Sequence, residues 1–321
     1  MRLLKLVPDN TNIGFVRLRY WAFGLTALLT IAAALLVGVR GLNLGVDFVG
    51  GVMIEARFQT APSLDAVRSD VDHLGVGDAA LQTFGAPNVV SIRLPLPAAT
   101  DEGATNRLVN KVQASLVAKY PGTVFNRAET VSGKVSGELI RNGLLAVLLA
   151  VVGIAVFSWL RYEWQFGVST FVSVAHDLLM TLGFFALTRM EFDLNIVAAV
   201  LTVISYSIND KIVIDDRIRE NMRKYRSMDM RALIDLSVNE TLPRTVMTSI
   251  TVLLALGAML VFGGPVLRGF TAAMMLGVVV GTYSSIYVSS SLLISLGLQP
   301  QRFADKRTKS GPASSAERIG R

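Results

Sequence analysis

Six long stretches of this sequence are apolar and almost free of charge, and they limit the possible folds more than any other feature. A helix needs roughly 20 apolar residues to cross a bilayer core about 30 Å thick. The stretches cover residues 20–39, 142–160, 164–188, 194–214, 245–267 and 269–299. Only 17% of the chain is charged, against about 25% in soluble domains. We therefore predict an α-helical membrane protein with six transmembrane helices.

The basic residues flank these stretches unevenly, and their distribution predicts the orientation of the chain. Lysine and arginine are concentrated in three segments, residues 1–19, an expected cytoplasmic loop near 215–244, and residues 300–321, whereas the short connection at 189–193 is net acidic. Both termini are therefore expected on the cytoplasmic side, with the basic tail disordered. The first stretch is longer than the core of a signal peptide and no small-residue cleavage site follows it, so we expect an uncleaved anchor.

The segment at 40–141 is the one part of the chain that can build a soluble core, on the side opposite the termini. Alternating apolar residues bounded by turn residues predict strands, and residues typical of helix starts and ends predict helices between them. The predicted strands are 50–58, 79–85, 88–95 and 122–133, and the predicted helices are 63–75 and 105–120. The order βαββαβ is that of a ferredoxin-like domain.

Several function classes are disfavoured by composition. The chain has no cysteine and two histidines, His73 and His176, so disulfides are excluded and a multi-histidine metal centre is not expected. The soluble segment shows no nucleophile–base pair, and we interpret His73 as an ordinary surface residue. We predict neither enzyme activity nor a cofactor. The net charge of +7 follows from the basic flanks of the membrane stretches, so nucleic acid is not an expected partner.

The fourth apolar stretch holds a carboxylate, Asp210, which costs about 2.5–3.5 kcal/mol to insert in a membrane helix. Its polar neighbours are Tyr206, Ser207 and Asn209. Arg244 opens the fifth stretch at the same end of the membrane, so an Asp210–Arg244 contact is expected. Two interpretations stay open: a structural ion pair or helix end, and a carboxylate that gains and loses a proton.

A second polar pair, His176 and Asp177, interrupts the third stretch. It is either a packing pair or a functional one. An intramembrane aspartyl protease that joins Asp177 to Asp210 is disfavoured, because the G-x-G-D setting is missing. The depths of the two carboxylates, about 21 Å and about 25 Å from opposite sides at about 1.5 Å per residue, also match poorly.

A glycine-rich heptad, GVDFVGG at 45–51, joins the first stretch to the soluble segment. Its glycines permit tight turns, and Asp47 either caps a turn or binds a partner.

Taken together, these motifs resemble the SecF family of protein-export membrane proteins. The family pattern G-x-D-F-x-G-G is matched by Gly45, Asp47, Phe48, Gly50 and Gly51. Further matches, in family order, are A-H-D at 175–177, E-F-D-L-N at 191–195, Y-S-I-N-D at 206–210, D-R-I-R-E-N at 216–221 and L-P-R-T-V-M-T-S at 242–249. The chain departs from the pattern at Val49 and Lys211, where threonine is common, and at Asp215, where an aromatic residue is usual.

The resemblance implies a half-transporter of the resistance–nodulation–division type, whose six helices pair with six from SecD in the bacterial inner membrane. Such a subunit would assist the SecYEG channel and the SecA motor, using the proton-motive force to complete preprotein export, and its periplasmic domain would help to pull or hold the preprotein. By position, Asp210 and Arg244 match the family's charged membrane residues tied to proton flow. Two alternatives stay open: a proton-driven small-molecule exporter of the same superfamily, and a translocase scaffold without proton coupling.

Overall fold

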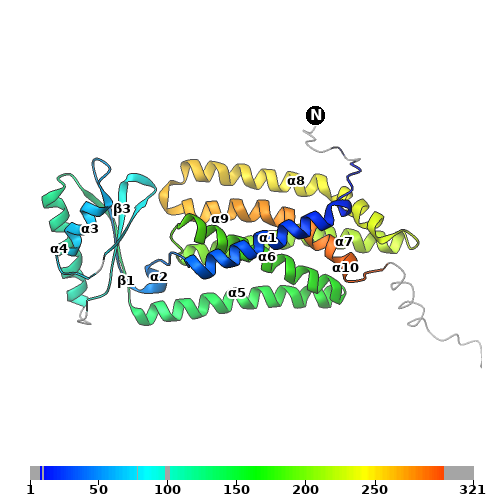
Figure 1. The fold of residues 1–321 in the computed structure, drawn as a ribbon, viewed down its shortest axis with the longest axis horizontal. Coiled ribbons are helices and arrows are strands. Elements are labelled where there is room, and N and C mark those ends of the chain that lie inside the picture. The colour runs from blue at the N-terminus through cyan, green and yellow to red at the C-terminus, as the bar shows by residue number, and fades with distance from the viewer. Residues whose placement is uncertain (1–7, 9–10, 78, 98–101, 300–321) are drawn as a thin grey trace, which may run out of the picture.

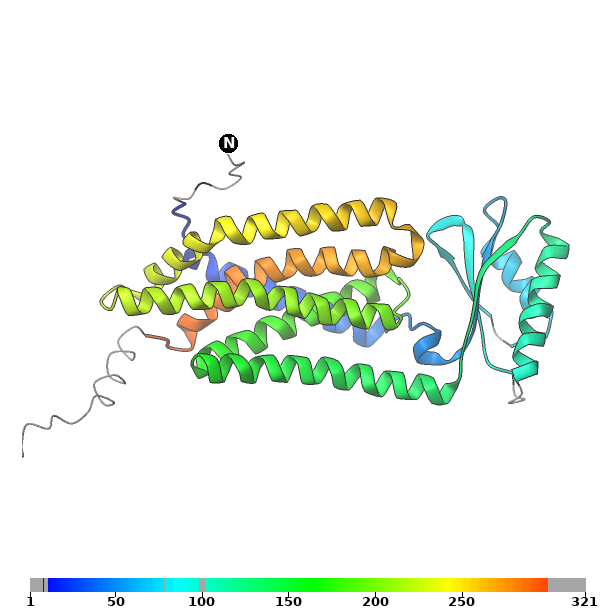
Figure 2. The same cartoon turned by 180° about the vertical axis from the view of Figure 1, so that it is seen from behind.

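The computed structural model describes residue 8 and residues 11–77, 79–97 and 102–299. A bundle of long helices and a small domain with a β-sheet lie end to end, so the molecule is elongated (Figures 1 and 2). We call residues 51–131 the sheet domain, the adjoining end of the bundle its domain end, and the opposite end its terminal end. The basic tail at 300–321, predicted to be disordered, lies outside the described residues.

Six helices of membrane-spanning length are found in the described part of the chain, as predicted. The helices are α1 (Arg19–Arg40, preceded by η1, Val16–Leu18), α5 (Gly133–Arg161), α6 (Trp164–Thr188), α7 (Leu194–Lys224), α8 (Met230–Phe262) and a last one built from α9 (Gly264–Tyr283), η2 (Ser284–Ser289) and α10 (Ser290–Ser295). Half of the apolar window of α6 is buried, against 11% for α1 and α5. The outer helices thus present apolar side chains to the surroundings, as lipid requires.

Several helices extend beyond the apolar stretches. Because α7 ends at Lys224 and α8 begins at Met230, most of the segment at 215–244, expected as a loop, is helical. The extended ends of α7 and α8 pack with the segment that precedes α1, in an apolar cluster at the terminal end of the bundle. This cluster includes Phe15, Val16, Met222, Leu233 and Ile234. Hydropathy marks the part of a helix that suits lipid, whereas packing against protein prolongs the helix beyond it.

The sheet domain has the predicted βαββαβ order. Its elements are β1 (Gly51–Arg57), α3 (Leu64–Asp72), β2 (Ala80–Phe84), β3 (Ala86–Leu94), α4 (Glu102–Lys119) and β4 (Val124–Val131). The strands pair in the order β2-β3-β1-β4, all antiparallel. The fold class, a six-helix membrane bundle with a small ferredoxin-like domain between the first two long helices, is therefore confirmed.

The two faces of the sheet have different surroundings. Val52, Ile54 and Ala56 of β1 are fully buried and pack with residues of α3 and α4 in one cluster. Met53, which alternates with them, lines a cleft toward the bundle. The helix-free face of the sheet is therefore turned toward the domain end of the bundle (Figure 1).

Replacing Gly51 with alanine is expected to destabilise the sheet domain. Gly51 has φ 129°, and an added Cβ atom would lie 2.5 Å from the carbonyl oxygen of Leu94. Backbone strain of this kind costs about 1–3 kcal/mol before the clash is counted. Amide hydrogen exchange of β1 and β3 measures the free energy of unfolding. In the control Gly137→Ala the new Cβ meets open space, and protection of the sheet should not fall. Equal protection in Gly51→Ala and the unaltered chain would contradict the prediction.

Candidate functional site

The glycine-rich heptad forms a one-turn helix, α2 (Val46–Val49), between α1 and β1. Its Asp47 accepts a hydrogen bond from the N–H of Leu194 at 2.9 Å, and Asp193 accepts one from the N–H of Ile196 at 3.0 Å. Two carboxylates therefore accept hydrogen bonds from otherwise free N–H groups at the start of α7. Their negative charges also interact favourably with the partial positive charge at the N-terminus of this helix. Of the two roles left open for Asp47, the structure shows a cap, although one on the distant α7 and not on a turn of its own segment.

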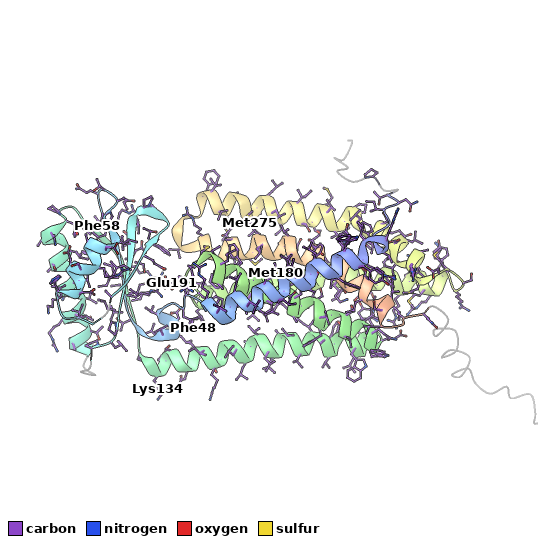
Figure 3. The ribbon with its side chains drawn as sticks, in the orientation of Figure 1. Phe48, Phe58, Lys134, Met180, Glu191 and Met275 are labelled. Atoms are coloured by element: carbon purple, nitrogen blue, oxygen red, sulfur yellow. The ribbon has the colours of Figure 1, made fainter. Side chains whose placement is uncertain are left out.

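The backbone before α2 pairs with the loop between α6 and α7. The N–H of Gly45 donates to the oxygen of Phe192 at 2.9 Å, and the N–H of Phe192 donates to the oxygen of Asn43 at 2.8 Å. Phe48 of α2 packs against Phe192 with ring centroids 5.9 Å apart. We call this joint the junction; it lies where the sheet domain meets the bundle, marked by Phe48 and Glu191 in Figure 3.

Buried polar side chains tie the junction to the sheet. Gln82 of β2 donates to Glu191 at 2.9 Å, and Arg93 of β3 donates to the oxygen of Leu44 at 2.5 Å. Arg93 also lies 4.0 Å from the Glu191 carboxylate. Burial raises the pKa of Glu191, the charge of Arg93 opposes this rise, and the carboxylate of Asp193 adds to it. Glu191 therefore keeps its proton to a higher pH than an exposed glutamate.

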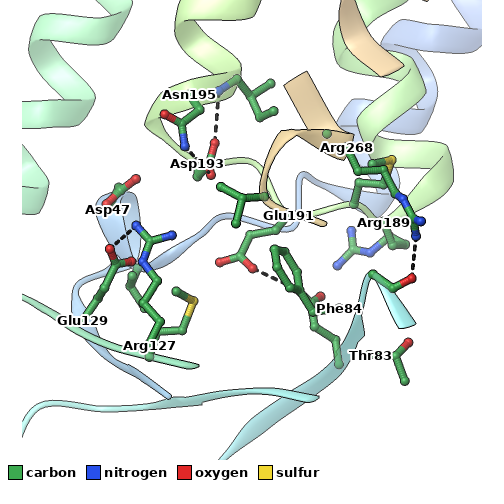
Figure 4. A pocket seen from close by; sticks show the side chains of 18 of the residues that line it. Asp47, Thr83, Phe84, Arg127, Glu129, Arg189, Glu191, Asp193, Asn195 and Arg268 are labelled. Carbon is green, nitrogen blue, oxygen red and sulfur yellow. Dashed lines mark hydrogen bonds and ion pairs between the residues drawn. The ribbon is translucent and has the colours of Figure 1, made fainter. Parts of the chain in front are cut away.

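A cleft of about 800 Å³ opens beside the junction, between the helix-free face of the sheet and the α6–α7 loop (Figure 4). Its lining includes Met53 and Arg127 from the strands and Asp193 from the loop. Arg268 of α9 donates to the oxygen of Gly85 at 2.6 Å. The junction and this contact thus hold the two parts together on either side of the cleft.

Asp210 lies within α7 and is only 3% exposed. The hydroxyl group of Thr282 on α9 lies beside it. Thr282 in turn bonds Ser249 of α8 at 2.8 Å, and Ser249 accepts a hydrogen bond from Tyr206 at 3.2 Å. A chain of hydroxyl groups therefore follows the line where α7, α8 and α9 meet. One carboxylate oxygen of Asp210, Oδ2, has no hydrogen-bond partner among the described residues.

Asp177 of α6 is the centre of a second polar cluster and is 1% exposed. It accepts hydrogen bonds from Ser207 of α7 at 2.5 Å and from Ser284 of η2 at 3.0 Å. No arginine or lysine forms an ion pair with Asp177 in the described part of the chain. An isolated carboxylate in an apolar bundle is stable only if it binds a proton or a cation.

The other predicted site residues are not all brought together. Arg244 is exposed midway along α8; its charge acts on Asp210, but the described residues form no Asp210–Arg244 ion pair. The expected contact is therefore not an ion pair, because Arg244 lies on an exposed face of α8 whereas Asp210 is buried. His176 bonds Thr30 of α1 at 2.7 Å, away from the partners of Asp177, and Asn209 is exposed on α7.

Ser207, predicted beside Asp210, donates to Asp177 instead, and the remaining hydroxyl partners of the two carboxylates were missed in the sequence. The last apolar stretch was interpreted as a plain span, although it contains the run SSIYVSSS at 284–291. Five serines in one apolar stretch are the signal that could have pointed to a polar helix face. Ser249 and Thr282 carry no such signal, since single hydroxyl groups are common in membrane helices.

Comparison with known proteins gives a consistent result over nearly the whole chain. Residues 111–299 match the family model described as protein export membrane protein SecD/SecF, C-terminal, and residues 35–62 match the SecD/SecF GG motif. The chain is 43% identical over 306 residues to protein translocase subunit SecF of Rhodobacter capsulatus, covering 92% of each chain. It is 37% identical over 291 residues to the same subunit of Rickettsia felis, covering 90% of this chain and 94% of that one.

Two solved structures are also similar. The crystal structure of SecDF, a translocon-associated membrane protein from Thermus thermophilus, matches with a TM-score of 0.82 and 34% identity over 91% of this chain. A SecDF structure in a super-membrane-facing form matches with a TM-score of 0.65 and 33% identity over 94% of this chain. This chain spans 39% and 40% of those two chains.

The stability of the junction should fall as pH rises, and Glu191→Gln should weaken that dependence. Because the pKa of Glu191 is raised above 4.5 in the folded chain, the folded state binds the proton more tightly than the unfolded state. The stability that Glu191 contributes is therefore complete below pH 4.5 and is lost as the pH rises through the pKa of Glu191 in the folded state. Hydrogen exchange of the Gly45 and Phe192 amides, corrected for the intrinsic rate, measures it.

Some pH dependence should remain in Glu191→Gln, because burial also raises the pKa of Asp193. Asp65→Asn is the control, since Asp65 is an exposed carboxylate on α3 with a 90% exposed side chain. An unchanged pH profile in Glu191→Gln would show that Glu191 does not carry the effect.

Proposed function

This chain belongs to the SecF family of protein-translocase subunits, and from that premise we propose that it works with SecD to complete preprotein export at the expense of the proton-motive force. The two subunits assist the SecYEG channel and the SecA motor in the bacterial inner membrane. The chain acts as a non-enzymatic transport component without a cofactor.

The buried carboxylate of Asp210 is the observation that carries this proposal. A charge in this place costs about 2.5–3.5 kcal/mol, and the hydroxyl groups around it offset only part of that cost. Reversible protonation makes such a group useful, because it is neutral when it faces hydrocarbon and charged when it faces water. The exposed guanidinium of Arg244, whose charge already acts on Asp210, favours release of the proton when the helices bring it closer.

The connection between proton binding and the sheet domain runs along α7. Asp210 lies about 24 Å along this helix from Leu194, at about 1.5 Å per residue. The start of the same helix is capped by Asp47 and paired with the segment that enters the sheet domain. A tilt of α7 is therefore transmitted to the sheet domain through the junction. This chain superposes less well on the super-membrane-facing SecDF structure than on the other SecDF structure, although the sequence identity is nearly equal. That difference supports the proposal that the bundle and the sheet domain change position relative to each other in this family.

The energy available is adequate for a two-state motion. One proton that crosses about 100 mV provides about 2.3 kcal/mol, and a swing from 1:99 to 99:1 requires about 5.5 kcal/mol. A few protons per cycle therefore suffice. In the proposed orientation both termini are cytoplasmic, the terminal end of the bundle faces the cytoplasm, and the sheet domain lies in the periplasm, where it holds the emerging preprotein.

Asp210→Asn should remove the gradient-dependent part of export and leave the rest. The amide keeps the size and hydrogen bonds of the side chain but cannot exchange a proton. The assay follows completion of preprotein export in vesicles that contain SecD, SecYEG and SecA, with and without an imposed proton gradient. Copurification with SecD checks assembly.

Asn209→Ala is the matched control, because Asn209 is the exposed neighbour of Asp210 on the same helix. Full gradient dependence in Asp210→Asn would favour a scaffold without proton coupling and would remove Asp210 from the mechanism.

A further inference from the structure

A buried ion pair lies one turn beyond Asp210 on α7. Lys211 Nζ is 3.0 Å from Asp215 Oδ2, and both side chains are at most 3% exposed. Lys211 also donates to Ser169 of α6 at 2.8 Å and to Ser289 of η2. Neither partner is turned to lipid or to water. Lys211 does not reach the bilayer surface, as an isolated lysine in a membrane helix would.

The serines around this pair form two tiers between α6 and η2. In the lower tier, nearer the terminal end, Ser169 and Ser289 bond each other at 2.8 Å. In the upper tier, Ser173 donates to Ser284 at 3.1 Å, and Ser284 donates to Asp177. The paired serines are four residues apart on α6 and five apart on η2, because η2 is a π-helix. A π-turn places residues five apart on the same face, which aligns the tiers.

We propose that these tiers form a proton route within this chain, which leads from the terminal end through Asp215 and Lys211 to Asp177. The inference rests on the proposed proton coupling and adds to it a route that does not include Asp210. We call Asp215, Lys211, the four paired serines and Asp177 the polar column.

Among the described residues, the polar column comes close to an exposed polar group at one end only. At its lower end, the exposed carboxylate of Asp216 acts on Asp215 and accepts a hydrogen bond from Tyr162 at 3.0 Å. Above Asp177, toward the domain end, an apolar cluster fills the bundle. This cluster includes Phe185, Ala199, Val203, Ala273 and Val278. Protons that reach Asp177 from the terminal end therefore stop there until the helices rearrange, as alternating access requires.

Each transfer along the polar column conserves protons and charge. A proton from the terminal end neutralises Asp215, and the ammonium group of Lys211 gives one of its protons to a lower-tier serine, which passes its own hydroxyl proton upward. The neutral amine of Lys211 then takes the proton of Asp215, so the ion pair is restored and one proton has moved to Asp177. The charges that act on the pair are those of its own members and of Asp216. Ser169 of α6 and Ser289 of η2 face it with hydroxyl groups.

The step between the tiers is the longest one. Ser169 and Ser173 lie one helical turn apart, with Cβ atoms about 5–6 Å from each other, and no hydrogen bond between the described serines joins the two tiers. A gap of this size between two hydroxyl groups is short enough for a single water molecule to bridge. Asp177 Oδ1 and Asp215 Oδ1 have no hydrogen-bond partner among the described residues, whereas Asp215 Oδ2 is held by the ammonium group of Lys211. A free acceptor is therefore available at both ends of the polar column.

Proton uptake into vesicles that contain this chain and SecD tests the route. An imposed pH gradient and an internal pH dye give the rate. Ser289→Ala removes one hydroxyl group and should lower the rate about tenfold, which corresponds to about 1.4 kcal/mol in activation free energy. Ser289→Thr keeps the hydroxyl group and should restore it. Ser290→Ala is the matched control, since Ser290 is equally buried but bonds its own helix at Ile286.

A double variant, Lys211→Met with Asp215→Leu, replaces the ion pair with apolar residues of similar size. Removing both partners together leaves no unpaired buried charge, so the protein should still fold and copurify with SecD. Its proton uptake should fall as in Ser289→Ala. If the pair only stabilises the bundle, the double variant will keep both assembly and proton uptake, and the route is then refuted.

Asp210→Asn separates this inference from the proposed function. If Asp210→Asn stops proton uptake while Ser289→Ala and the double variant leave it unchanged, the route is wrong and the proposed function stands. If neither Asp210→Asn nor the variants of the polar column change uptake, both are wrong. A loss in Ser289→Ala and in the double variant, together with a normal rate in Ser290→Ala, supports the route.

Discussion

The pairing of the α1–α2 segment with the α6–α7 loop is the constraint on which the rest of the structure depends. Two backbone hydrogen bonds and the carboxylate of Asp47 fix the start of α7 to the chain that enters the sheet domain. Since α7 also carries Asp210, Lys211 and Asp215, one rigid helix connects the buried charges with the sheet domain. The two parts of the molecule are thus joined through the start of this helix.

The distribution of polar groups follows from the solvent around the bundle. The outer helices α1, α5 and α8 are mostly exposed, with 11%, 11% and 17% of their apolar windows buried. Hydroxyl groups and carboxylates are concentrated where α6, α7 and the last helix meet, because lipid cannot satisfy them. Serine suits this place since its hydroxyl group both donates and accepts, and its small side chain lets helices approach closely.

The sequence predicts the large-scale architecture well and the site only in part. Apolar length and strand alternation depend on the chain itself, so the six helices and the βαββαβ order follow from them. The cap role of Asp47 was one of two open choices, because its partner Leu194 is far away in sequence. The exposed position of Arg244 was missed because hydropathy does not determine which way α8 is turned in the bundle. The pairing of Lys211 with Asp215 depends on which way α7 is turned in the bundle, and hydropathy does not determine that.

The π-helical turn at Ser284–Ser289 also bears on how such a bundle arises. A π-turn holds one residue more than the α-helical turn that it replaces, so it is equivalent to a single-residue insertion in an ordinary helix. In an ordinary α-helix such an insertion would rotate everything that follows by about 100°. The wider π-turn takes up the extra residue within itself, so α10 keeps the direction in which it presents Ser290 and Ser291, both 1% exposed. A descendant that lost one residue here would return to an α-helical turn with α10 facing its present neighbours, but Ser284 and Ser289 would no longer be spaced to face the same helix.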